Sequence, residues 1–442
     1  MSNQSQLRTR REFLRSTVLG GALSWTVPAF LANTIATLQA NAADSLVQPV
    51  TGKDGNILVV LQMAGGNDGL NTVVPHGNDY YHNARPKLGL KADDLLKLND
   101  ELALHRSLTG FKELFDKGEL GIVQGVGYPN PNRSHFRSTE IWQTAVDSQR
   151  IEAHGWLGRF FDNTCSGCDP TVAVNIGRQM PQAFAAAQPL GVSLETPQNY
   201  RFISADRPEG GHMSTEESYR RLNEPESEMS ENAGGTISAI GGAATHPGGA
   251  LDFLERVAMD AQVSSDKIRG IASRTEVQGN YPASQLGNAL KLVAKLIGGG
   301  LSTRVFYVSQ GGYDTHTNQS AAHERLLKDL GNSVQAFVSD MKEQGNLSRV
   351  LVMTFSEFGR RVAENASGGT DHGAAAPMFL AGNRIKSGLL GRYPSLAPKD
   401  LLQGDLGYTV DFRSVYAGVL ENWLKTPSAP ILGRSFPLLS PV

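Results

Sequence analysis

The chain has 442 residues, with 41 Lys and Arg against 43 Asp and Glu, which gives a formal net charge of −2. Apolar residues at 40% and charged residues at 19% are typical of a globular chain and exclude a disordered one. The near-neutral balance argues against nucleic acid as the main partner, because neutralising phosphates takes a basic excess. The two cysteines exclude a disulfide-built scaffold.

Residues 1–42 have the layout of a secretory signal. Arg10 and Arg11 precede an uncharged stretch rich in Gly, Ala, Ser and Thr, and Ala40-Asn41-Ala42 is a small-x-small cleavage site. The twin arginine predicts the Tat route, with the Tat translocase as the partner during export. A Sec signal or a membrane anchor is the alternative, but glycines, a proline and an asparagine interrupt the stretch. We therefore expect a mature chain of about 43–442 that is periplasmic or secreted and has no membrane span.

Strand-like and helix-like segments alternate along the mature chain. Asn56–Met63 is a near-continuous apolar run, which is typical of a strand buried on both faces of a parallel sheet. Further strands are expected at 119–126, 171–176, 304–310, 349–355 and 377–381, and helices at 108–117, from about 134, and at 251–274, 284–297, 321–344 and 415–424. This alternation predicts an α/β fold with a parallel sheet and helices on both faces.

The composition changes between about 205 and 250. Asp206–Glu231 is rich in acidic residues, and three Gly-Gly pairs follow it. We interpret this stretch as an exposed insertion in a single domain that spans 43–442.

Cys165 and Cys168 form a CxxC pair. In an exported protein this spacing favours a short loop disulfide, with free thiols as the alternative. A redox site would need a thioredoxin-like βαβ context, and a zinc site would need a second Cys or His pair nearby.

Polar residues lie just beyond the ends of the predicted strands, where ligands bind in open α/β sheets. Carboxylates and imidazoles are ligands of divalent metal ions, and a hydroxyl at a helix N-terminus suits a nucleophile. The sequence therefore predicts a site on one rim of the sheet, with Ser134 as the candidate nucleophile. Asp314 and His316 are a candidate metal pair, and His372 is a candidate for metal binding or acid–base work. Asp68 and Glu357 complete the set of candidate metal-site residues.

Each of these residues also has a structural interpretation. Asp68 suits an Asx turn and Ser134 a helix N-cap. Glu357 could pair with Arg360 or Arg361. The other candidates, Asp314, His316 and His372, could hold the glycine-rich loops through hydrogen bonds. The sequence contains no P-loop, no GxGxxG after a strand and no GxSxG, so a nucleotide site and an α/β-hydrolase elbow are disfavoured.

Six segments together resemble an uncharacterised bacterial Tat-exported family, domain of unknown function fifteen-hundred-and-one. They are Leu61–Pro75 (LQMAGGNDGLNTVVP), Arg133–Ser138 (RSHFRS), Gly311–His316 (GGYDTH), Thr354–Arg360 (TFSEFGR), Thr370–Gly373 (TDHG) and Asp411–Tyr416 (DFRSVY). The resemblance covers essentially the whole mature chain. It implies an alkaline phosphatase/sulfatase-like αβα sandwich with a mixed, mostly parallel sheet.

Enzymes of that superfamily hold two divalent metals, commonly zinc, beside a Ser or Thr nucleophile. By chain order the resemblance gives Asp68, Asp314, His316 and His372 the ligand roles and Ser134 the nucleophile role. The sequence departs from the superfamily pattern after the strand that ends at 355, where Ser-Glu replaces Asp-His, and in the Asp-to-His spacing of GGYDTH, which is two where four is usual. Fewer histidines and more carboxylates would favour Mg, Mn or Ca over Zn.

Two functions fit these features. The first is an exported metal-dependent hydrolase of phosphate or sulfate esters, acting on a small-molecule or glycan ester. The alternative is a non-catalytic protein of the same fold, with a degenerate site, that binds envelope components or polysaccharide.

Overall fold

The computed structural model describes residues 55–91, 95–165, 168–187, 191–200 and 263–439. The predicted signal segment (1–42) and the insertion expected near 205–250 lie outside these ranges and stay predictions. No helix within the described ranges is both long and apolar enough to cross a membrane.

The centre of the molecule is a nine-stranded sheet, with strand order β11-β5-β10-β9-β1-β8-β6-β7 and with β12 paired to β5. Its strands are β1 (Ile57–Met63), β5 (Leu120–Gly127), β6 (Ala173–Ile176), β7 (Val192–Leu194), β8 (Val305–Gln310), β9 (Val350–Phe355), β10 (Ala376–Ala381), β11 (Gly388–Leu390) and β12 (Val410–Asp411). The strand segments expected from the sequence are all present, with ends shifted by one or two residues.

The sheet is parallel except at β10. β1 pairs in parallel with both β8 and β9, whereas β10 runs antiparallel to β5 and β9. The carboxyl ends of the parallel strands and the start of β10 therefore meet at the same rim. The expected mixed, mostly parallel sheet is confirmed.

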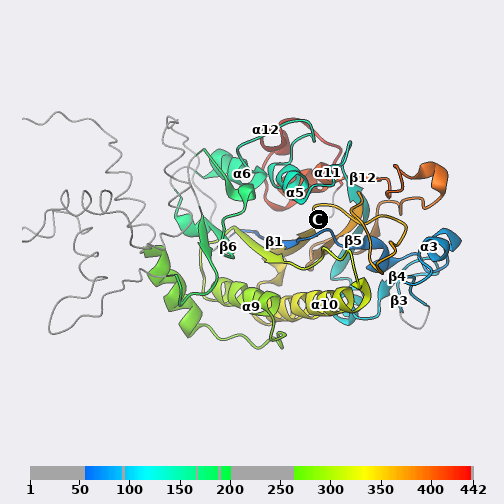
Figure 1. The fold of residues 1–442 in the computed structure, drawn as a ribbon. Coiled ribbons are helices and arrows are strands. Elements are labelled where there is room, and N and C mark those ends of the chain that lie inside the picture. Colours follow the sequence, from blue (N-terminus) through cyan, green and yellow to red (C-terminus); the bar gives the residue numbers. More distant parts are fainter. Residues whose placement is uncertain (1–54, 92–94, 166–167, 188–190, 201–262, 440–442) are drawn as a thin grey trace, which may run out of the picture.

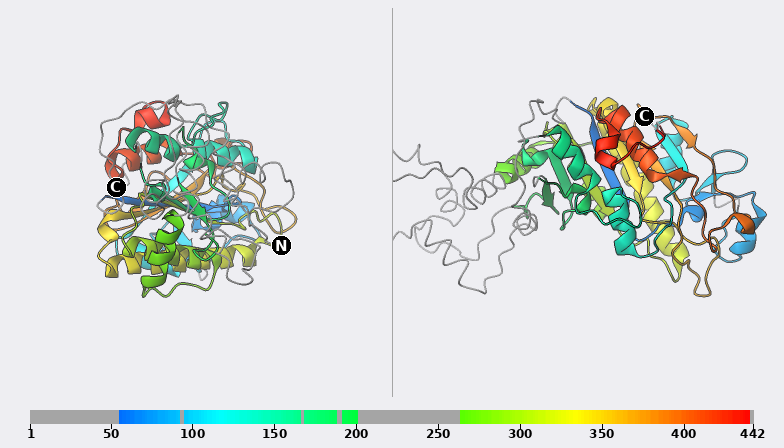
Figure 2. Two further views of the ribbon diagram at one scale, coloured as in Figure 1. Left: turned by 90° about the vertical axis from the view of Figure 1, so that its left-hand side faces the viewer. Right: turned by 90° about the horizontal axis from the view of Figure 1, so that it is seen from above.

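Helices cover both faces of the sheet (Figures 1 and 2). One layer contains α4 (Thr109–Asp116), α9 (Gln285–Gly298) and α10 (Gln319–Glu343), and the other contains α5 (His135–Thr144), α6 (Trp156–Thr164), α11 (Phe412–Gly418) and α12 (Ser428–Leu432). Successive side chains of β1 divide between the layers, as a strand requires. Val59 packs in the core under α9 and α10, and Val60 in the core under α5 and α11. The two apolar layers explain why β1 is a continuous apolar run, and they confirm the αβα sandwich.

A smaller antiparallel sheet lies beside the main one, with the order β2-β4-β3. It consists of β2 (Val73–Val74), β3 (Leu95–Lys97) and β4 (Ala103–His105), and the short helix α3 (Asp79–Ala84) lies between β2 and β3 in the chain. The sequence analysis missed these elements because strands of two or three residues carry too little periodicity to be recognised.

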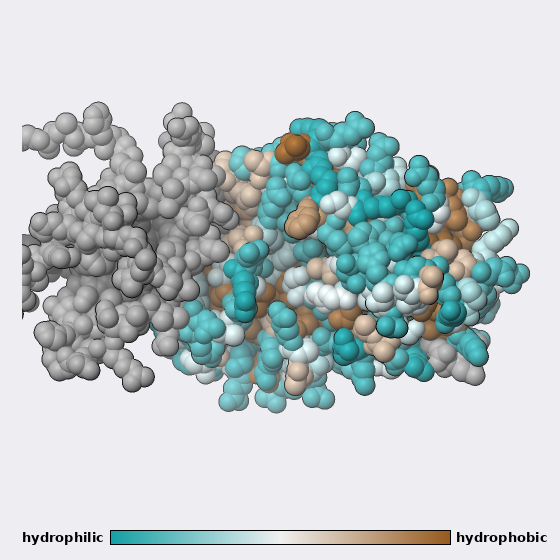
Figure 3. Space-filling model, in the orientation of Figure 1, coloured by the Kyte–Doolittle hydropathy of each residue, from teal (hydrophilic) through white to brown (hydrophobic). Residues whose placement is uncertain are grey.

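Three other features refine the sequence-based picture. The expected helix 415–424 is α11 followed by a π-helical turn at Val419–Trp423. Residues 263–274 are helical, and the rest of the helix expected at 251–274 lies outside the described ranges. Cys165 and Cys168 are joined in a disulfide, the alternative that the sequence analysis favoured over free thiols. The surface in Figure 3 is mostly hydrophilic, with hydrophobic residues scattered over it.

Candidate metal centre

Three histidines and one aspartate converge at the rim of the sheet. The Nε2 atoms of His316 and His372 are 2.9 Å apart, and each lies 3.1 Å from Oδ1 of Asp314. Nε2 of His135 lies 3.4 Å from Oδ2 of the same carboxylate. His135, Asp314 and His372 each offer a ligand atom within 4.8 Å of the other two. These separations are compatible with a shared ion, because bonds of roughly 2.0–2.6 Å place neighbouring ligand atoms about 3–4 Å apart.

The hydrogen bonds of the three rings fix which nitrogen faces this cluster. Nδ1 of His372 donates to the carbonyl of Arg133 over 2.8 Å, and Nδ1 of His135 donates to Glu357 over 2.8 Å. Nδ1 of His316 contacts Asp371 at 3.2 Å. When Nδ1 carries the proton of a neutral imidazole, Nε2 presents a lone pair. Three lone pairs and a carboxylate therefore face one another, an arrangement that a cation stabilises.

The topology explains why residues far apart in sequence meet here. Asp314 and His316 follow β8, and His135 opens α5 in the chain after β5. His372 precedes β10, but β10 is antiparallel, so the start of this strand lies at the rim where β8 ends. Gly65, after β1, allows the close approach: its φ is +119°, and a Cβ there would lie 2.5 Å from the backbone nitrogen of Asp314.

Arg360 is the buried cation that fixes the aspartate. Its side chain is fully buried and donates to Asp314 Oδ1 over 2.8 Å and to the carbonyls of Gly66 and Thr370 over 2.6 and 2.9 Å. Partial burial raises the pKa of Asp314, but the hydrogen bond and the positive charge of Arg360 outweigh it and lower that pKa to about 2. The carboxylate is therefore ionised at neutral pH. Arg360 pairs with Asp314 and not with Glu357, which corrects the alternative drawn from the sequence.

Glu357 holds His135 in the cluster through a hydrogen bond. Its Oε1 accepts from His135 Nδ1 and, over 2.8 Å, from the backbone N–H of Gly65. Its own carbonyl accepts from the indole N–H of Trp142 over 2.8 Å, which ties the end of β9 to α5. Its Oε2 is buried with no hydrogen-bond partner among the described residues. A carboxylate in this position orients the imidazole and makes it a stronger base.

Ser134 lies at the N-cap of α5, directly before His135. Its backbone is extended, its side chain is exposed and its hydroxyl makes no capping hydrogen bond. The backbone N–H of Ser134 donates to Oδ1 of Asn132 over 2.8 Å. The hydroxyl is therefore not committed to stabilising the helix.

Asp68 is placed apart from the four converging residues. Its carboxylate is fully buried, and Oδ2 accepts from Arg85 over 2.6 Å and from the Gln319 amide over 2.5 Å. Burial raises the pKa of Asp68, but Arg85, His323 and Gln319 outweigh that effect and lower it below the ordinary value of 3.8. Oδ2 is thus occupied by Arg85 and Gln319, whereas Oδ1 is buried with no hydrogen-bond partner among the described residues, and the metal-ligand role expected for Asp68 from the sequence stays a prediction.

The same network holds the loops of the rim. Arg85 donates through Nε and Nη2 to the carbonyls of Val362 and Arg361, each over 2.9 Å. Gln319, the first residue of α10, accepts through Oε1 from Thr370 over 2.6 Å. Asp68 is thus connected, through the side chains of Gln319 and Thr370, to the loop that carries His372.

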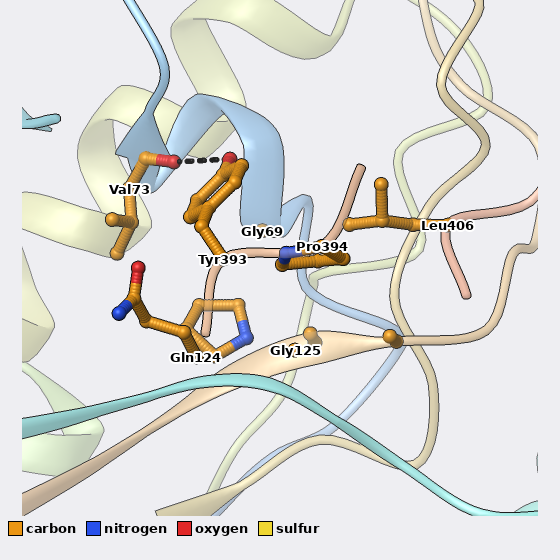
Figure 4. Close-up of a pocket in the computed structure, with 10 residues that line it drawn as sticks. Gly69, Val73, Gln124, Gly125, Tyr393, Pro394 and Leu406 are labelled. Atoms are coloured by element: carbon orange, nitrogen blue, oxygen red, sulfur yellow. Dashed lines mark hydrogen bonds between the residues drawn. The ribbon is translucent and has the colours of Figure 1, made fainter. Parts of the chain in front are cut away.

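A separate apolar hollow lies near the start of β10 (Figure 4). Gly69, Gln124, Pro394 and Leu406 are among its lining residues, and Tyr393 donates to the carbonyl of Val73 over 3.0 Å inside it. None of the converging ligand residues lines this hollow, so it is not the candidate centre.

Sequence reasoning did not assign His135, Arg360, Arg85 or Gln319 to the site. His135 had a usable signal, since it is adjacent to Ser134 at a helix start. The other three act through tertiary hydrogen bonds, which leave no local pattern.

A family model described as "Protein of unknown function (DUF1501)" matches residues 56–430. The comparison with curated proteins gave no match.

Among solved structures, similar proteins include three named for enzymes or for their superfamily. A protein in the alkaline phosphatase superfamily from Vibrio parahaemolyticus is 10% identical, with 92% of this chain and 77% of that chain covered and a TM-score of 0.38. The lipoteichoic acid synthase LtaP from Listeria monocytogenes is 9% identical, with 86% and 80% covered and a TM-score of 0.33. The PsFucS1 sulfatase from Pseudoalteromonas sp. is 10% identical, with 87% and 69% covered and a TM-score of 0.32. At these TM-scores the likeness is distant.

Proposed function

The chain belongs to this family of unknown function, DUF1501, and we propose that it is an exported, metal-dependent hydrolase of phosphate or sulfate esters. The observation that carries the proposal is the convergence of the Nε2 atoms of His135, His316 and His372 on the carboxylate of Asp314. The ester class comes from the resemblance to the alkaline phosphatase-like superfamily, and the export route comes from the twin arginine at Arg10 and Arg11.

The residues fit a divalent ion. Three imidazole nitrogens and one carboxylate form the donor set, and imidazole-rich sites suit Zn better than Mg or Ca. Nε2 of His135 is buried and makes no hydrogen bond, so a lone pair is available there. The sequence alone favoured Mg, Mn or Ca over Zn, whereas this donor set favours zinc. Manganese is the one of those three harder ions that imidazole ligands also suit.

His135, Asp314, His316 and His372 would hold the ion, and Glu357 would orient His135 through Nδ1. When bound, the ion would act as a Lewis acid on a phosphoryl or sulfuryl oxygen. Ser134 is the proposed nucleophile, because its hydroxyl is exposed, free of a capping bond and adjacent to His135. The first backbone N–H groups of α5 have no intrahelical acceptors and favour negative charge at this point.

The test is a metal and turnover assay on the purified mature chain. We expect stoichiometric bound metal, hydrolysis of an aryl phosphate or an aryl sulfate, loss of hydrolysis with a chelator and recovery on adding metal back. His372→Ala should weaken metal binding more than about 100-fold, since losing a direct ligand should exceed the 10–100-fold cost of losing an outer partner.

His154→Ala is the matched control, because His154 is half-buried and lies away from the rim sequence motifs. It should leave metal content and turnover unchanged. A wild-type chain with neither metal nor turnover would contradict the proposal and favour the non-catalytic binding protein.

A further inference from the structure

Two arginines beside the candidate centre share one buried carboxylate. Arg133 donates through Nε and Nη2 to Oδ2 of Asp405 over 2.8 and 2.6 Å, and Nε of Arg361 lies 3.6 Å from the other oxygen. The carboxylate is only 2% exposed, whereas the side chains of Arg133 and Arg361 are 36% and 38% exposed. The buried carboxylate of Asp405 therefore anchors two partly exposed guanidinium groups at the surface.

The backbone places both arginines next to the candidate centre. The carbonyl of Arg133 accepts from Nδ1 of His372, and the N–H of Arg361 donates to the carbonyl of Asp371 over 3.0 Å. Arg360 and His372 form an antiparallel bridge. Because neighbouring side chains on an extended strand point to opposite sides, Arg361 points away from buried Arg360 and toward solvent.

These guanidinium groups keep donors available. Two positive charges face one carboxylate, and Arg361 has no side-chain hydrogen bond to any residue in the described part of the chain. The exposed carboxylate of Asp371 attracts Arg361 electrostatically, but its hydrogen bonds are to His316 and Asn365. The planar fork of arginine matches the oxygens of sulfate, phosphate and carboxylate groups.

We propose that Arg133 and Arg361 form an oxyanion subsite that binds a second anionic group of the substrate, beside the ester at the metal centre. The substrate class is then an ester with at least two sulfate or phosphate groups, such as a multiply sulfated oligosaccharide. The position of the cleaved group rests on the proposed function, but the subsite itself binds its oxyanion without metal.

The first experiment measures binding by titration calorimetry on the mature chain at low salt with EDTA. The probes are a monosulfated disaccharide, its unsulfated counterpart and inorganic sulfate. We expect the monosulfated disaccharide to bind and the unsulfated one not to bind. Arg361→Gln should weaken binding about tenfold, equivalent to about 1.4 kcal/mol, and Arg361→Lys should recover part of it. Inorganic sulfate should compete with the disaccharide, because the same guanidinium groups can bind it. Binding of sulfate without binding of the monosulfated disaccharide would identify a free-anion site and overturn the substrate class.

Arg178→Gln is the charge-matched control, since Arg178 is 81% exposed and pairs with Glu195 at the β6–β7 edge of the sheet. It should bind like the wild type. Equal binding by the wild type and Arg361→Gln would overturn the subsite.

The second experiment uses the metal-loaded enzyme. Arg361→Gln should raise KM about tenfold for a disulfated ester, which loses about 1.4 kcal/mol of binding, while kcat stays unchanged and KM for a monosulfated aryl ester does not move. Binding with EDTA but no turnover would contradict the proposed function alone, and turnover without EDTA-resistant binding would contradict the subsite alone.

Discussion

Arg85 donates to the carboxylate of Asp68 over 2.6 Å, and both side chains are fully buried. Asp68 follows the first strand and, by chain order, has the position of a metal ligand. In the structure the positive charge beside it is the guanidinium group of Arg85. This pair also links β1 to the rim loops, because Arg85 reaches the carbonyls of Arg361 and Val362.

Breaking this buried pair should destabilise the fold. Arg85→Met leaves the Asp68 carboxylate buried without its cation, so we expect a loss of about 3–5 kcal/mol in the free energy of unfolding. Denaturant unfolding with EDTA measures it. Lys117→Gln is the control, because Lys117 pairs with Glu113 at the surface and its loss should leave the free energy of unfolding nearly unchanged.

Asp68→Asn separates the two roles of this residue. If Asp68 only pairs with Arg85, folded Asp68→Asn protein should bind metal with wild-type affinity while its stability falls. A folded variant that has lost metal would instead support the ligand role expected from the sequence.

Stability should fall on acidification between about pH 6.5 and pH 4 because of His323. Burial, the largest effect, lowers the pKa of this histidine from 6.5 to about 4, so the folded state stays neutral while the unfolded chain takes up a proton. The stabilising contribution is present above the unfolded pKa and is lost as pH falls through the folded value, a change of roughly 3 kcal/mol.

The measurement is the free energy of unfolding across this pH range with EDTA present. His323→Gln should flatten the profile, because glutamine keeps a donor for Asn67 but does not titrate. His82→Gln, at an exposed position, should retain the wild-type slope. A wild-type profile that is flat from pH 6.5 to pH 4 would rule out the shifted histidine.

Glu357 should control metal affinity through His135. Glu357→Gln removes the anion at His135 Nδ1 but keeps the side-chain size, so we expect about 10–100-fold weaker metal binding. Competition with a fluorescent chelator measures the affinity. Glu364→Gln is matched chemically, since Glu364 accepts from the N–H groups of Lys87 and Leu88 away from His135, and it should bind metal normally.

Much of the fold could be predicted because its signals are local. β1 is buried on both faces and reads as a continuous apolar run, and α9 begins at Ser284, which caps it through Gly287. The rim also followed, since residues just after parallel strands must gather at one edge. Asp314 and His316 could be selected on that basis alone, whereas His372 precedes the antiparallel strand β10.

The remaining features depend on tertiary contacts. Nothing local indicates that Arg85 will reach Asp68, or that Gln319, 251 residues away in sequence, will share that carboxylate. The availability of Nε2 on His372 follows from the carbonyl of Arg133, a partner 239 residues away. Such choices are set by packing, so sequence could name the ligand types but not separate the converging residues from Asp68.

Ser134→Ala tests whether this serine reacts or only begins a helix. If Ser134 is the nucleophile, the variant should lose ester hydrolysis and keep its bound metal, because the proposed ligands are other side chains. Its free energy of unfolding should change by less than about 0.5 kcal/mol, since its hydroxyl makes no capping bond, whereas a capping serine contributes about 0.5–2 kcal/mol. Ser284→Ala is the control: that hydroxyl accepts from the N–H of Gly287 over 2.9 Å and donates to Asp329 over 2.6 Å, so this variant should lose at least the capping contribution and keep full turnover. Turnover, bound metal and denaturant unfolding would be measured on both variants, and undiminished hydrolysis by Ser134→Ala would assign the nucleophile elsewhere.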